Sequence, residues 1–318
     1  MFDVSVCVAM FNAGKVIVRG VEALFAQTMR DGIEFIFVDD GSTDGSVDEL
    51  RKQLERFPEV AGQVRIIELA SNGGAGNARM RGFAECTGRY VICCDIDDRP
   101  DPEWCRTLYR KAVSENADMV YCDFTEVEVD GRRRAVSGGR ANTAEGMIRE
   151  LLSGKVMGSL WMRMYRREIV RLELRKAMPD GVRCCEDLLM NLIMLRRCRT
   201  ISKVEAPLYD YIRNPASVTK TLNREARKSI YVVMRCVVEM FSKEVPFEYL
   251  QYPMRRALYA AISVDVPSGG EWRKMWCGAK RGMWRDSNFG IFQKALFYLA
   301  CINLPLARFV YCCCRCSP

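Results

Sequence analysis

Two rhythms of hydrophobic and polar positions alternate along the first 122 residues. Short apolar runs, typical of buried strands, occur at residues 4–9, 33–38, 64–69, 90–94 and 118–122. Between them lie longer segments whose apolar residues recur at helical spacing, at 15–27, 43–57, 75–86 and 103–115. Strands that alternate with helices in this way predict a doubly wound α/β fold with a largely parallel sheet.

The pattern changes after residue 123. Two short runs around Asp130-Gly131, at 124–129 and 133–136, predict a β-hairpin. A helix, a strand and a second helix are expected at 143–152, 159–165 and 187–197. Beyond Lys220 the pattern is mostly helical and basic, so we divide the chain into residues 1–220 and 221–318.

Charge is unevenly distributed between the two ends of the chain. Residues 1–120 carry 14 Lys or Arg against 20 Asp or Glu, whereas residues 121–318 carry 34 against 20. This asymmetry indicates a site that gathers carboxylates and a separate surface that meets anions. Nucleic acid, phospholipid and a phosphorylated substrate are all such anions, and charge alone does not choose among them.

The chain contains no histidine. Catalytic triads that depend on histidine are therefore excluded, and any acid–base chemistry must use carboxylates, Lys, Tyr or Cys. The 16 cysteines follow an amino-terminal segment without the pattern of an export signal. We therefore expect reduced thiols and a cytoplasmic protein.

Polar or glycine-rich segments follow four of the predicted strands, at 11–12, 39–42, 71–74 and 95–98. In a doubly wound sheet the ligand crevice lies beyond the carboxyl ends of the strands. Asp95, Asp97 and Asp98 suit Mg²⁺ or Mn²⁺ bridged to phosphate, because like charges held together need a cation. A simple cap for the following helix is the competing interpretation, which the position after a buried strand disfavours. Asp39 and Asp40 predict either a turn or a contact to the imide N–H of uracil.

These segments resemble the family-2 inverting glycosyltransferases over roughly residues 3–220. The resemblance rests on the order of short motifs, at 4–12, 26–28, 38–46, 72–79, 87–98, 161–168, 186–187 and 207–217. It implies a GT-A fold in which residues 1–220 bind a nucleotide-diphosphosugar donor and pass the sugar to an acceptor hydroxyl with inversion. The donor is expected to be a UDP-sugar.

The resemblance also implies roles for single residues. Asp187 would be the general base, with Glu186 beside it, and Asp97 and Asp95 would bind the divalent metal, Mn²⁺ or Mg²⁺. Trp161 would lie on the acceptor side. The donor would contact Phe11, Asn12, Asp39, Asp40, Asn72, Arg79, Asp95, Arg213, Ser217 and Lys220.

The carboxyl-terminal residues 221–318 carry 15 Lys or Arg against 7 Asp or Glu. The nearly wholly apolar run at 295–307 is shorter than the roughly 20 residues that cross a bilayer. It fits a helix in the interface of an anionic membrane or a helix packed on the catalytic part. With a glycan or a lipid-linked acceptor, the enzyme would act peripherally at the inner face of the cell membrane, in surface polysaccharide or glycolipid assembly.

Two other functions remain as alternatives, and a third, nucleic-acid binding, is disfavoured. A metal-dependent nucleotidyltransferase would need a glycine-rich, basic loop directly after the first strand to hold a triphosphate. This chain has Phe11-Asn12-Ala13-Gly14-Lys15 there, which fits that requirement poorly. A catalytically inactive scaffold that binds nucleotides or anions would keep the fold without turnover. Nucleic acid is not an expected partner, because clustered carboxylates repel phosphates.

Overall fold

The computed structural model describes residues 2–170, 174, 178–179, 181–213, 223–264, 283–285 and 289–315. The amino-terminal part contains β1 (Val4–Met10), α1 (Ile17–Phe25), β2 (Ile33–Asp39), α2 (Ser46–Arg56), α3 (Pro58–Ala61), β3 (Val64–Glu68), α4 (Ala75–Glu85), β4 (Tyr90–Asp95), β5 (Arg99–Pro100) and α5 (Trp104–Ser114). All the strands and helices predicted here are present, with ends that differ by a few residues.

The middle of the chain contains β6 (Met119–Val127), β7 (Arg133–Val136), α6 (Ala144–Leu152), β8 (Arg163–Arg166), α8 (Glu186–Leu195) and β9 (Ile201–Ile212). The predicted hairpin is confirmed as the antiparallel pair of β6 and β7. Strand β8 begins at Arg163 rather than at residue 159, and β9 is a strand that the sequence pattern did not predict. Its pairing with β6 shifts register twice, so its burial does not alternate regularly.

The strands form one mixed sheet in the order β3-β2-β1-β4-β8-β6-β9-β5, with β7 added to β6. Strands β3, β2, β1 and β4 are parallel, and β6 and β9 are also parallel. Strand β8 lies antiparallel between β4 and β6. The chain leaves β1 toward β2 and later returns to β4 on the other side of β1, so the expected doubly wound α/β arrangement is confirmed with antiparallel exceptions.

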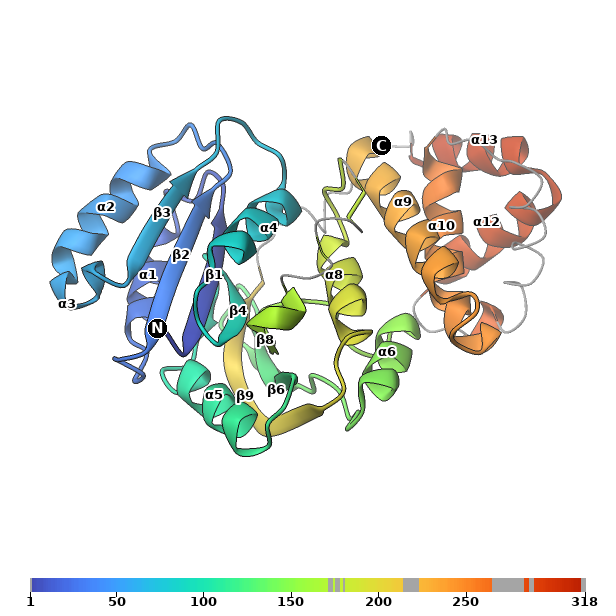
Figure 1. Cartoon of the computed structure of the whole chain (residues 1–318). Helices are drawn as coiled ribbons and strands as arrows, with labels where there is room; N and C mark the ends of the chain where they lie inside the picture. The colour runs from blue at the N-terminus through green and yellow to red at the C-terminus, as the bar shows by residue number, and fades with distance from the viewer. Residues whose placement is uncertain are drawn as a thin grey trace.

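Hydrophobic residues cover both faces of this sheet. Along β1, Val6 and Val8 pack with α1 and α5, whereas Cys7 points to the opposite face and packs with α4. Successive side chains of a strand alternate between faces, and both faces are covered by helices, which explains the nearly continuous apolar runs in the sequence. Figure 1 shows the strands between these helices.

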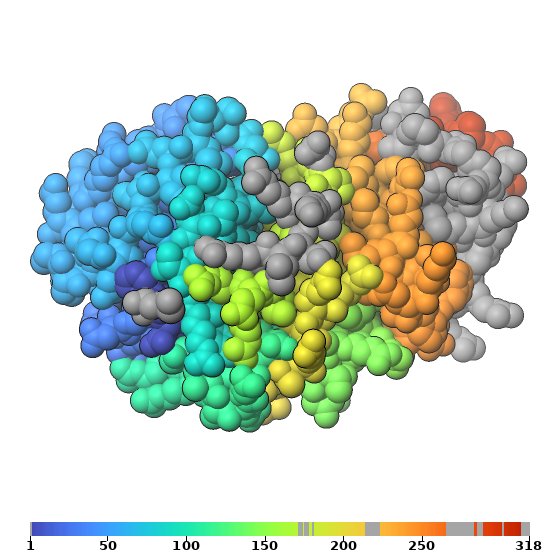
Figure 2. Space-filling view, viewed as in Figure 1, coloured from blue at the N-terminus to red at the C-terminus, as the bar shows by residue number. Residues whose placement is uncertain are grey.

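The carboxyl-terminal region is mainly helical in its described part, as predicted. It contains α9 (Arg224–Phe241), α10 (Phe247–Ser263), the 3₁₀ turn η1 (Met283–Arg285), α12 (Ile291–Ile302) and α13 (Leu304–Arg315). Figure 2 shows α9 and α10, in orange, beside the green-to-yellow residues of the middle of the chain. Among the residues that the structure describes, no helix combines the length and hydropathy needed to cross a membrane.

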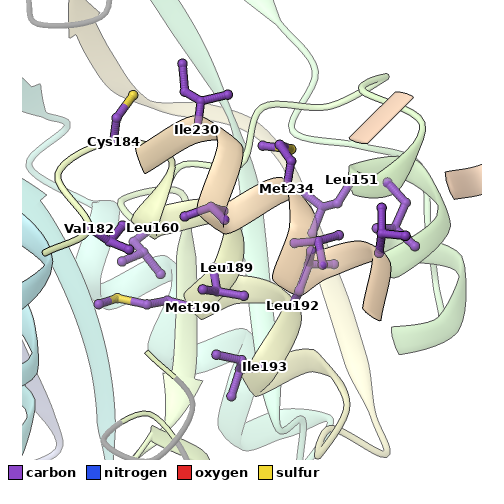
Figure 3. Packing of buried hydrophobic residues seen from close by; sticks show 14 of the residues in the cluster. Leu151, Leu160, Val182, Cys184, Leu189, Met190, Leu192, Ile193, Ile230 and Met234 are labelled. Carbon is purple, nitrogen blue, oxygen red and sulfur yellow. The ribbon is translucent and has the colours of Figure 1, made fainter. Parts of the chain in front are cut away.

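Helix α8 joins this region to the sheet. Its Leu189 and Leu192 are completely buried and pack with Leu151 of α6 and Met234 of α9 (Figure 3). Burying each such side chain contributes about 1.5–3 kcal/mol to stability. The first turn of α8, which carries Glu186 and Asp187, is therefore fixed by a well-packed helix body.

Candidate active site

The carboxyl ends of three neighbouring parallel strands lie at one level. In the register of the sheet Met10 of β1 pairs with Asp39 of β2, and Ala9 pairs with Asp95 of β4. The chain changes winding direction between β1 and β4, and such switch points hold the ligand crevice of α/β sheets. The structure therefore brings the predicted residues near 11–12, 39–42 and 95–98 to one edge.

The loop after β2 separates two aspartates that the sequence could not distinguish. The carboxylate of buried Asp40 accepts hydrogen bonds from the backbone N–H groups of Gly73, at 2.9 Å, and Gly74, at 2.7 Å. Asp39 accepts one bond through Oδ2, from the Ser42 N–H at 2.9 Å. Its Oδ1 is buried and has no hydrogen-bond partner among the described residues. Asp40 thus holds the glycine loop, and Asp39 retains an acceptor.

Asn12 has a structural role in the loop after β1. It adopts a positive φ of 48°, its N–H donates to Ser42 Oγ at 2.8 Å, and its Oδ1 accepts from the Thr43 N–H at 3.0 Å. These bonds tie the loops after β1 and β2 together. The neighbouring Phe11 has its side chain exposed.

The guanidinium of Arg79 joins three predicted site carboxylates that come from separate parts of the sequence. From α4 it reaches Asp95 Oδ1 at 2.8 Å, Glu186 Oε1 at 3.1 Å and Asp187 Oδ1 at 2.6 Å. Only 8% of the Arg79 side chain is exposed. Charge-assisted bonds of this kind are strong when water is largely excluded.

A glycine permits this approach. A Cβ atom placed on Gly76 would lie 3.1 Å from Glu186 Cγ, a contact tighter than most side chains tolerate. The start of α8 can therefore pack closely against α4, which brings Glu186 within reach of Arg79.

Burial raises the pKa of Asp187 to about 7, although the positive charge of Arg79 opposes the rise. The negative charges of Glu186 and Asp95 also contribute to this raised pKa. A carboxyl group that exchanges its proton near neutral pH is suited to general base catalysis. About 21% of the Asp187 side chain is exposed, so a substrate can reach it.

The loop after β4, residues 95–98, carries carboxylates whose negative charge and hydrogen-bonding capacity are not fully balanced by neighbouring groups. Burial and the charge of Asp95 raise the pKa of Asp97. Asp98 accepts one hydrogen bond from the Ile212 N–H at 2.8 Å, and its buried Oδ2 has no partner among the described residues. Burial also raises the pKa of Asp98. A cation at this loop would relieve both effects.

Asn72 contacts a residue that the sequence interpretation missed. Arg183 donates through Nη1 to Asn72 Oδ1 at 2.5 Å and through Nη2 to the Asn72 carbonyl at 3.1 Å. Arg183 lies three residues before Glu186 in the segment that leads into α8. Its position next to the predicted motif at 186–187 was the one feature of the sequence that could have indicated a role in the site.

The prediction for Trp161 requires correction. Only 2% of this residue is exposed, and its ring stacks on Tyr209 at 4.4 Å and on Tyr211 at 5.7 Å between centroids. A ring buried in this way offers no face to an acceptor. Trp161 instead supports Tyr209, whose buried hydroxyl accepts a hydrogen bond from the Asp95 N–H at 3.1 Å.

The remaining predicted donor contacts have different outcomes. Arg213 forms an ion pair with the buried carboxylate of Glu126 at 2.8 Å, and its N–H donates to the Val127 carbonyl. These contacts hold Arg213 against β6, and its role as a donor contact stays a prediction. Ser217 and Lys220 lie outside the described residues.

The comparisons with known proteins agree with this geometry. Residues 5–172 match the family described as glycosyl transferase family 2, and this match covers more than half of the chain. The chain therefore belongs to the family-2 glycosyltransferases, the family that the sequence motifs resemble. EpsH of Bacillus subtilis (strain 168) is 29% identical over 232 residues, which make up 71% of this chain and 65% of EpsH. The aligned region thus spans less than two thirds of that relative.

Solved structures share the fold. TarS 1–349 of S. aureus, in complex with UDP-GlcNAc, aligns with a TM-score of 0.66 at 17% identity, over 96% of this chain and 90% of that one. The mannosyltransferase PcManGT of Pyrobaculum calidifontis, in complex with GDP-Man and Mn²⁺, aligns with a TM-score of 0.56 at 14% identity, over 96% of this chain and 86% of that one. At these identities the likeness concerns the fold alone, and it confirms the expected GT-A fold.

Proposed function

We propose that this protein transfers a sugar from a nucleoside diphosphate donor to an acceptor hydroxyl, with inversion at the anomeric carbon. The observation that carries the proposal is the Arg79 cluster, which gathers Asp95, Glu186 and Asp187 at the switch point of the sheet. Family membership supplies the reaction class, and the cluster supplies a base in a chain without histidine.

In this proposal Asp187 removes the proton of the acceptor hydroxyl. Its carboxylate is held by Arg79 at 2.6 Å, and α8 fixes the backbone that carries it. The deprotonated oxygen of the acceptor then attacks the anomeric carbon from the face opposite the leaving nucleoside diphosphate. One displacement of this kind inverts the anomeric configuration, which NMR of the product reports.

The donor in this proposal carries uridine. The unpartnered Oδ1 of Asp39 is an acceptor suited to the imide N–H of uracil, whereas both oxygens of Asp40 already accept backbone bonds. Exposed Phe11 lies at the same edge of the sheet and offers an apolar surface to the base. TarS, which shares the fold, has been crystallised with UDP-GlcNAc.

The residues of the acidic loop fit a divalent metal, Mn²⁺ or Mg²⁺. Asp97 and Asp95 would hold it, because Asp97 carries an unfavourable, partly buried charge and oxygen ligands suit these ions. Within the described residues no group of three or more Asp, Glu, Cys or His side chains is arranged to hold a metal. We therefore expect donor oxygens and water to complete the coordination. When bound, the metal would offset the charge of the leaving diphosphate.

Thermal shift tests this proposal. A ligand that binds only the folded state raises the melting temperature, so UDP with Mn²⁺ should raise it and EDTA should abolish the effect. Asp97→Asn should lose the metal-dependent part of the shift, whereas Asp210→Asn, at a surface ion pair, should keep it. A larger shift with GDP would overturn the uracil assignment.

The same panel separates the alternatives. A nucleoside triphosphate that stabilises the protein more than any diphosphate would favour a nucleotidyltransferase. UDP binding without transfer to any glycan or lipid-linked acceptor would favour a catalytically inactive scaffold. No shift with any nucleotide, in a sample that melts cooperatively, would contradict the donor site itself.

The acceptor in this proposal is a glycan or a lipid-linked sugar of surface polysaccharide or glycolipid assembly, met at an anionic membrane. Helices α12 and α13 pack on α10 through residues such as Leu296 and Phe297, which are buried. Ile302 and Phe309 are 77% and 65% exposed, and α12 also carries Lys294. Exposed apolar side chains next to cations suit a membrane interface.

Vesicle flotation tests this surface. The protein should bind vesicles of phosphatidylglycerol more strongly than vesicles of phosphatidylcholine, and binding should weaken as salt rises. The double variant Ile302→Ser with Phe309→Ser should lower the bound fraction several-fold. Val129→Ser, at a 72% exposed position on the β6–β7 turn, is the matched control. Equal binding of all variants would contradict the proposal.

A further inference from the structure

Two adjacent cysteines stand directly before the catalytic carboxylates and have no part in the proposed transfer. Cys184 is buried, Cys185 is half-buried, and their sulfur atoms lie 3.9 Å apart. Cys184 belongs to the buried cluster that contains Ile230 of α9 (Figure 3). Cys185 immediately precedes Glu186. The pair therefore joins the core beneath α8 to the first turn that carries the base.

Two positive groups face the sulfur of Cys185. Arg256, from α10, donates through Nη2 to Cys185 Sγ at 3.3 Å. Cys185 is also the N-cap residue of the ten-residue helix α8, so the positive end of the helix dipole lies beside it. Arginine and a helix N-terminus are the surroundings that stabilise a thiolate in reactive cysteines.

The titration of the pair agrees with this geometry. The pKa of Cys185 is lowered to about 7 by the hydrogen bond from the Cys184 thiol and by the charge of Arg256, against the opposing effects of burial and Glu186. Burial instead raises the pKa of Cys236, the other half-buried thiol among the described residues. Cys185 thus differs from the remaining thiols by its neighbours rather than by its residue type.

We infer that Cys185 is a peroxide-reactive thiolate with Cys184 as its resolving thiol, and that their oxidation switches the active site off. The effect on the active site rests on the proposed function, whereas the thiol chemistry does not. Redox-sensing cysteines share these features, which are thiolate character, access to solvent and a second thiol within reach.

The chemistry balances in two steps. The Cys185 thiolate attacks one oxygen of hydrogen peroxide, and the O–O bond breaks. The attacked OH group stays on the sulfur as a sulfenic acid, and the leaving hydroxide takes a proton from solvent to become water. The Cys184 sulfur then attacks the Cys185 sulfur, the S–O bond breaks, and the departing hydroxide and the thiol proton form water. Two electrons pass from the cysteine pair to peroxide. A dithiol reductant reverses the change by thiol–disulfide exchange.

Oxidation must disturb the start of α8. The two sulfur atoms must approach from 3.9 Å to about 2 Å to form the bond, and the small ring encloses the peptide between the cysteines. The backbone of Cys185, which has a positive φ of 64°, must rotate to close this ring. Since Glu186 and Asp187 follow at once, their bonds to Arg79 change with it.

Alkylation kinetics test the reactive thiol. Near pH ~6.5, iodoacetamide should modify Cys185 roughly five-fold faster than exposed Cys312, since a larger thiolate fraction outweighs a lower nucleophilicity. Arg256→Met should slow this reaction several-fold, and Arg256→Lys should restore part of the rate. Cys236→Ser is the control that should leave it unchanged. Equal rates for Cys185 and Cys312, or an unchanged rate in Arg256→Met, would overturn the inference.

Peroxide treatment tests the switch. The wild-type protein should lose two hydrogens in mass, with residues 184 and 185 linked, and dithiothreitol should reverse the loss. Cys184→Ser should stop at a sulfenic acid that dimedone traps. Oxidation should also speed amide hydrogen exchange in the first turn of α8, a readout that needs no turnover. Oxidation elsewhere first, or unchanged exchange, would refute the switch.

Transfer assays complete the test. The oxidised wild type should lose most of its activity and regain it with dithiothreitol, while Cys185→Ser should keep its activity after peroxide. If the reduced protein transfers no sugar, the proposed function fails. The alkylation rates and the amide hydrogen exchange still test the thiol chemistry in that case. Full activity of the linked form would overturn the inference.

Discussion

Two aspartate-rich loops lie at the same edge of the sheet and differ in how their carboxylates are compensated. In the β2 loop, residues 39–46, Asp40 accepts two backbone N–H groups and Asp44 accepts the N–H groups of Gly14 and Ser46. In the acidic loop, residues 95–98, Asp98 retains a buried oxygen without a partner among the described residues. Backbone N–H groups thus satisfy Asp40 and Asp44 of the first loop and leave Asp39 Oδ1 there as a free acceptor among the described residues, whereas the second loop holds several carboxylates that a cation would stabilise.

The difference teaches that residue type alone does not assign a carboxylate to structure or to chemistry. Backbone N–H groups satisfy a carboxylate without any ligand, whereas neighbouring carboxylates leave it in need of a cation. Arg79 supplies one such cation, and its bonds to Asp95 and Asp187 connect the acidic loop to α8. Substitutions in the two loops should therefore have different consequences.

The largest effect should come from the proposed base. Asp187→Asn keeps an oxygen for Arg79 but cannot accept a proton, so kcat should fall by about 10²–10⁴-fold. The thermal shift with UDP and Mn²⁺ should persist. Asp210→Asn is the matched control, because Asp210 has the same 21% side-chain exposure and an arginine partner. A kcat close to the wild-type value would remove Asp187 from the mechanism.

The pH dependence should follow Asp187. The base acts when deprotonated, and its pKa is raised to about 7, so kcat/KM should rise with pH up to about 7 and then level off. Below that midpoint the rate should fall about ten-fold per pH unit. Glu186→Gln removes a negative charge that raises this pKa, and the midpoint should move to lower pH. A midpoint that moves upward would contradict the assignment.

Asp40 should matter for stability. Asp40→Ala leaves the N–H groups of Gly73 and Gly74 without their acceptor, which should lower the free energy of unfolding by about 1–3 kcal/mol. Urea denaturation measures this change. Nucleotide selectivity should be unaffected in the folded fraction. A stable variant that no longer distinguishes UDP from GDP would reverse the roles given to Asp39 and Asp40.

Substitution of Asp39 should have a smaller effect, and it should weaken nucleotide binding rather than stability. Asp39→Asn keeps an oxygen for the Ser42 N–H, so the free energy of unfolding should change little. The affinity for UDP should fall by about ten-fold, since a charge-assisted bond to the base is lost. Calorimetric titration of UDP with Mn²⁺ measures this affinity. An unchanged affinity for UDP would show that the uracil ring does not bind at Asp39.

The alternation of apolar runs and helical segments determined the fold of residues 4–122, because a strand buried on both faces must be apolar throughout. The sequence also placed Asp39, Asp95 and Asp97 at strand ends. It missed β9, whose register shifts hide the alternation of a strand, and it placed Trp161 on the acceptor side, although its ring is buried. The sequence alone does not distinguish an aromatic residue stacked in the core from one at a binding surface.

Tertiary structure alone decided which charged residues meet. Arg79 and Asp187 are more than a hundred positions apart, and only the packing of α8 against α4 at Gly76 brings them to 2.6 Å. Arg256, which contacts Cys185, lies on α10, outside the part of the chain that carries the family motifs. Periodicity records which side chains are buried locally, whereas ion pairs and the pKa values they set depend on distances between segments that no local pattern encodes.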